Sequence, residues 1–287
     1  MKATPTAVAV LLVGTADALS ILASPRRAAW RCASPCATEP SLPLLADDIW
    51  DAARPVRVEG NTLRTWALGA ESAERLQLSI RSSGRPVHAE VELWQTPSYV
   101  PSKCKVWLED GAATPFHALI EMPRQPETVA VFNKVTSERD GVLDAASDDS
   151  FAASMTYPFE VSVLADGSGR TASDALSGAT PELVQGGKVT SFAFGAEVQS
   201  VQLQLQTEQR DMKAFVEVLQ NPDDQNQIFE IEATEPSTPF YAFVTLAGGA
   251  NVIRIINQNT VEFPLYVSLL PYETTPVEAV VMGGPSW

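Results

Sequence analysis

The sequence repeats itself, and this repeat constrains the fold more than any other feature. Segments of the first half match segments of the second half in unbroken order. The matched segments are Val58–Gly60 with Val184–Gly186, Trp66–Glu71 with Phe192–Glu197, Leu76–Ile80 with Val201–Leu205, Val91–Pro97 with Val216–Pro222, Thr114–Ala118 with Thr238–Ala242, Val129–Asn133 with Val252–Asn257, and Pro158–Leu164 with Pro264–Leu270. The matched Glu-x-x-x-Pro and Thr-Pro-Phe details exceed what two unrelated strand patterns share. We therefore interpret the chain as an internal duplication.

Each copy has the residue pattern of short β-strands. Leu76, Leu78 and Ile80 alternate with polar residues, as do Val201, Leu203 and Leu205 in the second copy. Alternation with a period of two is typical of a strand with one buried face. Prolines and glycines separate these segments, and long helical patterns are absent from both copies. The sequence therefore predicts an all-β fold of two tandem, homologous, antiparallel β-sandwich-like domains.

The repeat also suggests boundaries. Residues 1–45 form a leader, 46–164 the first β repeat, 165–180 a small and polar linker, 181–272 the second repeat and 273–287 a tail. The longer spacing at the end of the first copy corresponds to an insert at residues 134–156, which holds four aspartates. This insert lacks the EF-hand pattern, so we interpret it as a solvated acidic loop.

Composition limits the functions that this chain can have. The net charge is −15, and no basic stripe is present, which argues against nucleic-acid binding. No run of 18 apolar residues occurs, so we expect no transmembrane segment in the mature chain.

The leader resembles a two-part targeting address. Lys2 precedes a short apolar run at residues 7–13, as in a secretory signal peptide, and a segment rich in Arg and Ser but poor in acids follows at residues 18–38. Signal peptide followed by transit peptide is the address of plastids of secondary endosymbiotic origin. Ordinary secretion is the alternative. Beyond the leader only Cys104 remains, and no glycosylation sequon is present, which argues against an extracellular destination.

Residues that carry chemistry are scarce. The only histidines are His88 and His117, and no nucleotide, metal or hydrolase motif occurs. Cys104 with either histidine is a conceivable nucleophile and base, but a small buried side chain explains Cys104 better. The Glu90/Glu92 and Glu230/Glu232 pairs fit one exposed strand face better than they fit glycoside chemistry. The sequence thus predicts no enzyme and no cofactor.

Two other features suggest binding to a partner. Trp94, Tyr99 and Trp107 are candidates for a sugar-stacking platform, so a carbohydrate-binding β-sandwich module is the alternative function. The tail alternates apolar residues and then ends in a tryptophan. We expect it to dock on a neighbouring subunit, or to fold back on its own domain, through Val277, Val281, Gly283, Gly284, Pro285 and Trp287.

Charge is distributed unevenly between the copies. Residues 55–164 carry 10 basic and 15 acidic residues, whereas residues 181–287 carry 4 and 13. The first copy of one subunit is therefore predicted to meet the second copy of a neighbour through Arg75, Arg81 and Arg85.

The repeated pattern resembles the pyrenoid shell proteins of diatoms and related algae. The likeness covers Pro55 to Leu270, and it rests on the following segments: Val58–Gly60, Leu63–Leu68, Val91–Pro97, Thr114–Phe116 and Tyr157–Val163. The resemblance implies a non-enzymatic structural protein that assembles with itself into a sheet around the Rubisco-filled pyrenoid and supports CO2 concentration. It also implies a location at the pyrenoid periphery in the plastid stroma, with Rubisco or other pyrenoid proteins as further partners.

Overall fold

The computed structural model describes residues 49–68, 75–95, 99–122, 127–134, 157–166, 176, 178–208, 210–220, 224–234 and 239–275. These residues form one short helix and sixteen strands. The first half contains α1 (Ile49–Ala52), β1 (Val56–Val58), β2 (Leu63–Leu68), β3 (Arg75–Arg81), β4 (Val87–Trp94), β5 (Ser102–Leu108), β6 (Phe116–Glu121), β7 (Glu127–Asn133) and β8 (Phe159–Asp166). The second half contains β9 (Glu182–Val184), β10 (Val189–Phe194), β11 (Val198–Gln206), β12 (Met212–Gln220), β13 (Gln225–Ala233), β14 (Phe240–Thr245), β15 (Asn251–Asn257) and β16 (Leu265–Thr274). The predicted all-β fold is confirmed.

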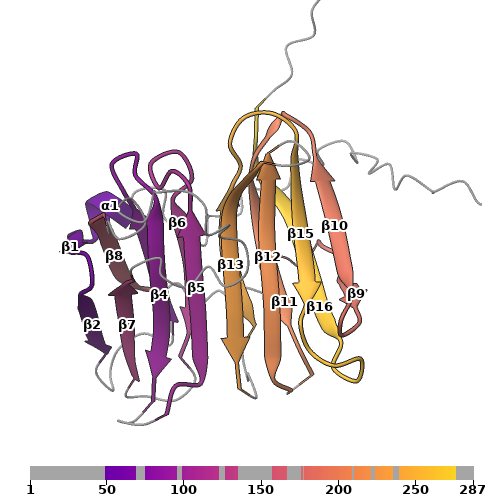
Figure 1. The fold of residues 1–287 in the computed structure, drawn as a ribbon, viewed down its shortest axis with the longest axis horizontal. Helices are drawn as coiled ribbons and strands as arrows, with labels where there is room; N and C mark the ends of the chain where they lie inside the picture. Colours follow the sequence, from indigo (N-terminus) through magenta and orange to yellow (C-terminus); the bar gives the residue numbers. More distant parts are fainter. Residues whose placement is uncertain are drawn as a thin grey trace, which may run out of the picture. The chain divides into compact units, whose positions relative to one another are not determined.

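The strands form two eight-stranded sheets, and every pairing in them is antiparallel. Sheet A has the order β1-β8-β3-β6-β14-β11-β16-β9, and sheet B has the order β10-β15-β12-β13-β5-β4-β7-β2. Each sheet takes four strands from each half of the chain (Figure 1). The sequence repeat makes each strand from β1 to β8 the counterpart of the strand numbered eight higher. With these counterparts, the strand order of each sheet is symmetric about its middle. The sequence did not indicate that the two halves share both sheets.

The two halves meet at one strand pair in each sheet. In sheet A, β6 pairs with β14, and Ala118 lies opposite its repeat counterpart Ala242. In sheet B, β5 pairs with β13, and Lys105 lies opposite Glu230. Matched residues therefore lie opposite each other where the halves join. This arrangement is that of a pseudo-twofold axis passing through both sheets.

The core lies between the sheets and is built by the alternation seen in the sequence. Leu76, Leu78 and Ile80 of β3 are fully buried, and they pack in one cluster with Val201 and Leu203 of β11. The polar residues between them were expected to face water, but Gln77, Ser79, Gln202 and Gln204 are also buried. A half-buried strand is therefore the wrong description of β3 and β11.

Chain segments beside the sheets explain this burial. On the outer side of sheet A, Ser162 of β8 hydrogen-bonds through Oγ to the carbonyls of Ile49 and Ala53, so α1 covers this part of the first half. In the second half, Leu176 is buried in a satellite cluster with Leu119, Tyr241 and Phe243. Leu176, which lies in the predicted linker of residues 165–180, is thus packed against sheet A. The domain boundaries themselves stay a prediction.

A buried asparagine makes the same side-chain hydrogen bonds in each half. Asn133 Nδ2 donates to the carbonyls of Val58 and Tyr157, at 3.1 and 2.9 Å, and Asn257 Nδ2 donates to those of Val184 and Phe263, both at 2.9 Å. The turn from β1 to β2 and the turn from β9 to β10 also share a backbone conformation, since Asn61 and Gly187 have φ values of 58° and 71°. Left-handed backbone is open to glycine and tolerated by asparagine, which accounts for both residue types.

Candidate assembly surfaces

The outer face of sheet B carries rows of paired charges. Glu90 on β4 is only 3% exposed and contacts both Lys103 and Lys134. Burial raises the pKa of Glu90, but hydrogen bonds from Lys103 and Lys134 outweigh this effect and leave the pKa below its ordinary value. The sequence predicted an exposed face for the Glu90/Glu92 pair. This prediction is wrong for Glu90, because the two lysine side chains cover it.

Further ion pairs continue this row across the join between the halves. Lys105 Nζ lies 3.0 Å from Glu230 Oε2, and Arg254 Nη1 lies 2.9 Å from Glu217 Oε2. Lys213 lies 3.9 Å from Glu232. The carboxylates of this face are thus largely neutralised by cations of the same chain.

The aromatic residues do not form one sugar platform. Trp107 lies opposite His88, six residues along β4 from Trp94, which separates the two indoles by roughly 20 Å. Trp94 donates through Nε1 to Glu92 and its ring packs against Phe132, while the Trp107 ring packs edge-on against His88. Tyr99 is exposed in the connection between β4 and β5. The observation that suggested carbohydrate binding is therefore not supported.

Cys104 and the histidines face different surroundings. Cys104 is buried in the core cluster, and burial raises the pKa of its thiol far above the ordinary value. His88 stands between the core residues Val87 and Ala89 on β4, so its side chain faces away from the core. The Nδ1 atom of His117 lies 2.6 Å from Ser79 Oγ, and burial lowers the pKa of His117 to about 4. The interpretation of Cys104 as a small buried side chain is confirmed, and the nucleophile and base do not meet.

The three arginines of the predicted interface lie against other groups of the same chain. Arg75 is buried on β3. Arg81 forms an ion pair with Glu160 at 3.0 Å, and its guanidinium lies 4.1 Å from the centre of the Trp50 ring. Arg85 lies 5.1 Å from the centre of the Tyr157 ring. Their role in assembly stays a prediction, and the tail residues lie outside the described part of the chain.

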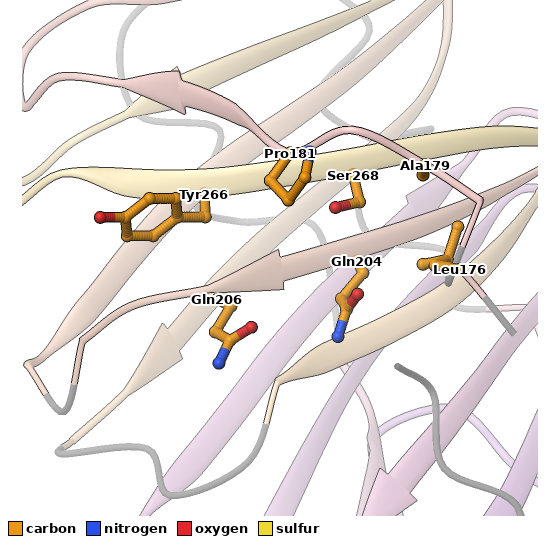
Figure 2. Close-up of a pocket in the computed structure, with 7 residues that line it drawn as sticks. All are labelled: Leu176, Ala179, Pro181, Gln204, Gln206, Tyr266 and Ser268. Carbon is orange, nitrogen blue, oxygen red and sulfur yellow. The ribbon is translucent and has the colours of Figure 1, made fainter. Parts of the chain in front are cut away.

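A pocket of about 220 Å³ lies on the outer side of sheet A in the second half (Figure 2). Gln204 and Gln206 of β11 line it together with Tyr266 and Ser268 of β16, and Leu176, Ala179 and Pro181 supply its apolar lining. Figure 2 shows Tyr266 at one end and Leu176 at the other. The volume is below the range of about 300–1,000 Å³ that is typical of small-molecule sites, and it suits one large side chain.

The matching surface of the first half is covered by its own chain. The sequence repeat matches Leu176 with Trp50, and Gln206 with Arg81. In the first half the Trp50 ring and Arg81 are in contact, and the ion pair between Arg81 and Glu160 lies beside them. The pocket therefore arises where the second half carries smaller or uncharged side chains in place of this stacked pair.

The two ends of sheet B are the longer open strand edges in the described part of the chain. β2 ends the sheet in the first half and β10 ends it in the second half, and each is six residues long. Leu63 of β2 is 37% exposed and Val189 of β10 is 53% exposed. By contrast, β1 and β9 at the ends of sheet A are three residues each, and a short edge strand offers little backbone to a partner.

Metal and membrane sites were also sought in the described residues. Within these ranges no group of three or more His, Cys, Asp or Glu side chains is arranged to hold a metal ion. No helix of the described chain is long and apolar enough to cross a membrane.

The fold and these surfaces define a two-layer antiparallel β-protein with a long open strand at each end of one sheet. The chain belongs to the diatom pyrenoid shell protein family, whose family model matches residues 50–271. This family is one of structural shell proteins of the plastid pyrenoid, and it is not an enzyme family. The resemblance seen in the sequence is confirmed.

Other comparisons add little. A search of curated proteins finds no match. Among solved structures, the subviral particle of infectious bursal disease virus VP2 has 12% identity and a TM-score of 0.13, covering 76% of this chain and 63% of that one. The Gx strain of the same virus has 9% identity and a TM-score of 0.12, covering 71% of this chain and 61% of that one. The chain thus spans less than two thirds of the length of either viral protein.

Proposed function

We propose that this chain builds the pyrenoid shell by lateral association with copies of itself into a continuous sheet. The observation that carries this proposal is the family match over residues 50–271, which spans nearly all of the described strands. The geometry supports it, because each subunit has two different ends, one formed by β1 and β2 and the other by β9 and β10. Contacts between unlike ends propagate without closing when successive subunits are related by translation, and they then give an open row of subunits.

The charge distribution and the tail are the two candidate sources of contacts that the sequence offers. The less acidic first half of one subunit is proposed to face the more acidic second half of a neighbour, with Arg75, Arg81 and Arg85 contributing. The tail from Val277 to Trp287 is proposed to dock on a neighbouring copy, and the pocket between Gln204 and Tyr266 has a suitable size for an indole ring.

The wider role follows from the same proposal. A sheet of this protein would enclose the Rubisco-filled pyrenoid and thereby support CO2 concentration and fixation. The Arg- and Ser-rich segment behind the apolar run of the leader supports delivery to the plastid stroma by a two-part address. Rubisco and other pyrenoid proteins are the proposed further partners.

Electron microscopy of the purified full chain tests this function. We expect extended sheets or tubes, together with a large sedimenting species whose amount rises with protein concentration. A monodisperse monomer at high concentration would contradict the proposal. Deleting residues 276–287 tests the tail separately, because wild-type sheets that persist after the deletion would exclude tail docking while leaving self-assembly intact.

A further inference from the structure

Within the described residues, the outer edges of β2 and β10 lack the usual protection against strand pairing. Natural edge strands are commonly blunted by lysine, proline, bulges or short length. Among the residues of β2 and β10 there is no lysine and no proline, and both strands pair in unbroken register with their inner neighbours. An open edge of this kind is a template for another strand.

Hydrogen bonds in the adjoining turns show which backbone groups face outward. The backbone N–H of Asn257 donates to the Lys188 carbonyl, and the backbone N–H of Asn133 donates to the Thr62 carbonyl, both at 3.0 Å. Because antiparallel ladder bonds alternate along a strand, Thr190 and Phe192 then bond to β15, and Arg64 and Trp66 bond to β7. The residues between them present their N–H and C=O groups to the outside. These outward residues are Leu63, Thr65 and Ala67 on β2, and Val189, Ser191 and Ala193 on β10.

We propose that β10 of one copy pairs antiparallel with β2 of a second copy, so that sheet B continues from subunit to subunit. This inference rests on the proposed self-assembly and names its interface. Outward residues pair with outward residues, so the register with the largest overlap places Thr65 opposite Ser191. Leu63 then lies opposite Ala193 and Ala67 opposite Val189. Each of these pairs combines uncharged side chains that sterically fit one face of a sheet.

Strand direction allows this pairing by simple translation. Sheet B has eight strands, and each of them runs antiparallel to its neighbours. With an even number of alternating strands, β2 and β10 run in opposite directions, so a translated copy presents β10 antiparallel to β2. The same translation brings β9 of one copy beside β1 of the next in sheet A, because β1 lies at the β2 end and β9 at the β10 end (Figure 1).

Charge favours joining unlike ends over joining like ends. In the strands at one end the charged residues are Arg57 and Arg64, whereas Glu182 is the charged residue in β9 and β10. Pairing β1 with β1 of a second copy would place Arg57 opposite Arg57, and like charges directly opposite each other are destabilising. Pairing β1 with β9 instead brings the strand that carries Glu182 to the strand that carries Arg57, whose guanidinium also pairs with Glu59 of its own chain at 2.7 Å.

Aromatic side chains at both ends of sheet B give a further reason for pairing β2 with β10 of another subunit. Trp66 of β2 and Phe192 and Phe194 of β10 pack against the core but are only partly buried. An added strand would cover these rings and remove apolar surface from water. The open ends thus combine unpaired backbone with incompletely buried core residues.

Cross-linking of mixed single-cysteine variants tests both the pairing and its polarity. In a full chain carrying Cys32→Ser and Cys36→Ser, Thr65→Cys and Ser191→Cys are made as separate proteins, leaving only the buried Cys104 besides the new thiol. A short bismaleimide is expected to link the two variants when they are mixed under conditions of assembly, and to link neither variant to itself. Self-linking of the Thr65→Cys variant would overturn the head-to-tail arrangement.

A backbone block tests the same edge without cross-linking. Ser191→Pro removes an outward N–H while leaving the ladder to β15 intact, and Ser191→Thr is the matched control that keeps it. We expect the proline variant to raise the protein concentration needed for assembly at least about tenfold, with an unchanged unfolding midpoint. Sheets that form equally well from this variant would overturn the edge proposal while the shell function stands. Failure of the wild-type chain to assemble would contradict the shell function instead.

Discussion

At the scale of single residues, buried polar groups fix the details of the fold. Asn133 and Asn257 are the last residues of β7 and β15. Each bonds to the last residue of an edge strand of sheet A, β1 or β9, and to the chain that leads into β8 or β16. The period-two pattern placed them in strands but did not indicate this role, because a buried amide in a strand looks like any polar residue in a sequence. Their matching bonds in the two halves allow a quantitative test of the repeat.

Replacing either asparagine by alanine should destabilise the protein to a similar extent. Each replacement leaves two buried carbonyls without their donor, which costs about 1–3 kcal/mol. Asn133→Ala and Asn257→Ala are therefore expected to lower the free energy of unfolding by amounts within about 1 kcal/mol of each other. Denaturant unfolding of the two variants measures this. A large effect in one half and none in the other would contradict equivalent roles.

Glu90 is the second residue with a defined energetic role. Glu90→Gln removes the charge that Lys103 and Lys134 share, and it is expected to cost about 1.5–3 kcal/mol of unfolding free energy. Glu92→Gln is the control, since Glu92 lies 3.7 Å from Lys103 and is more exposed, and its loss should cost less than about 1 kcal/mol. Equal effects in thermal or denaturant unfolding would show that the burial of Glu90 is not what matters.

His117 should make the protein sensitive to mild acid. Its pKa of about 4 in the folded chain lies below the ordinary value of 6.5, so between these values the unfolded chain binds the extra proton. Stability is therefore fully present above pH 6.5 and decreases as the pH falls toward 4. His117→Gln should flatten this dependence, by up to about 1.4 kcal/mol per pH unit. Identical pH profiles for variant and wild type in unfolding experiments would exclude this contribution.

At the scale of elements, the sequence predicted strand faces well and strand partners poorly. Alternation identifies which side of β3 or β11 packs inward, because that choice depends only on neighbouring residues. Which strands lie side by side depends on hydrogen bonds between strand edges that are distant in sequence. No local pattern in the segments of β5, β6, β13 and β14 indicates that these strands join the two halves. Burial of the outer face of β3 was missed for the same reason, because α1 is distant in sequence.

The contact between α1 and sheet A gives a test at this scale. Trp50→Ala removes the ring that stacks on Arg81 and uncovers part of the β3 and β8 surface. We expect a loss of about 1–2 kcal/mol from the stacking and the apolar area together. Leu176→Ala probes the matching position in the second half, where the side chain is buried against Tyr241 and Phe243. A Trp50→Ala variant as stable as wild type would show that the Trp50 ring adds nothing to the stability of sheet A.

At the scale of the whole molecule, the two halves form one sandwich whose sheets run through the join without interruption. The candidate interfaces drawn from the sequence were the tail and the arginines, and the described arginines have partners within the chain. The edges of sheet B become visible only once the strand order is known, because nothing in the β2 or β10 segments alone marks them as terminal strands. The structure therefore shifts the emphasis from surface charge to strand edges.

High-resolution electron microscopy of sheets assembled from the full chain tests the central claim most directly. The account predicts that β10 of each subunit is hydrogen-bonded to β2 of the next, with a repeat across the strands of roughly 38 Å, which is eight strands at about 4.8 Å each. Sheets in which both β2 and β10 face solvent, or in which like ends meet, would contradict it.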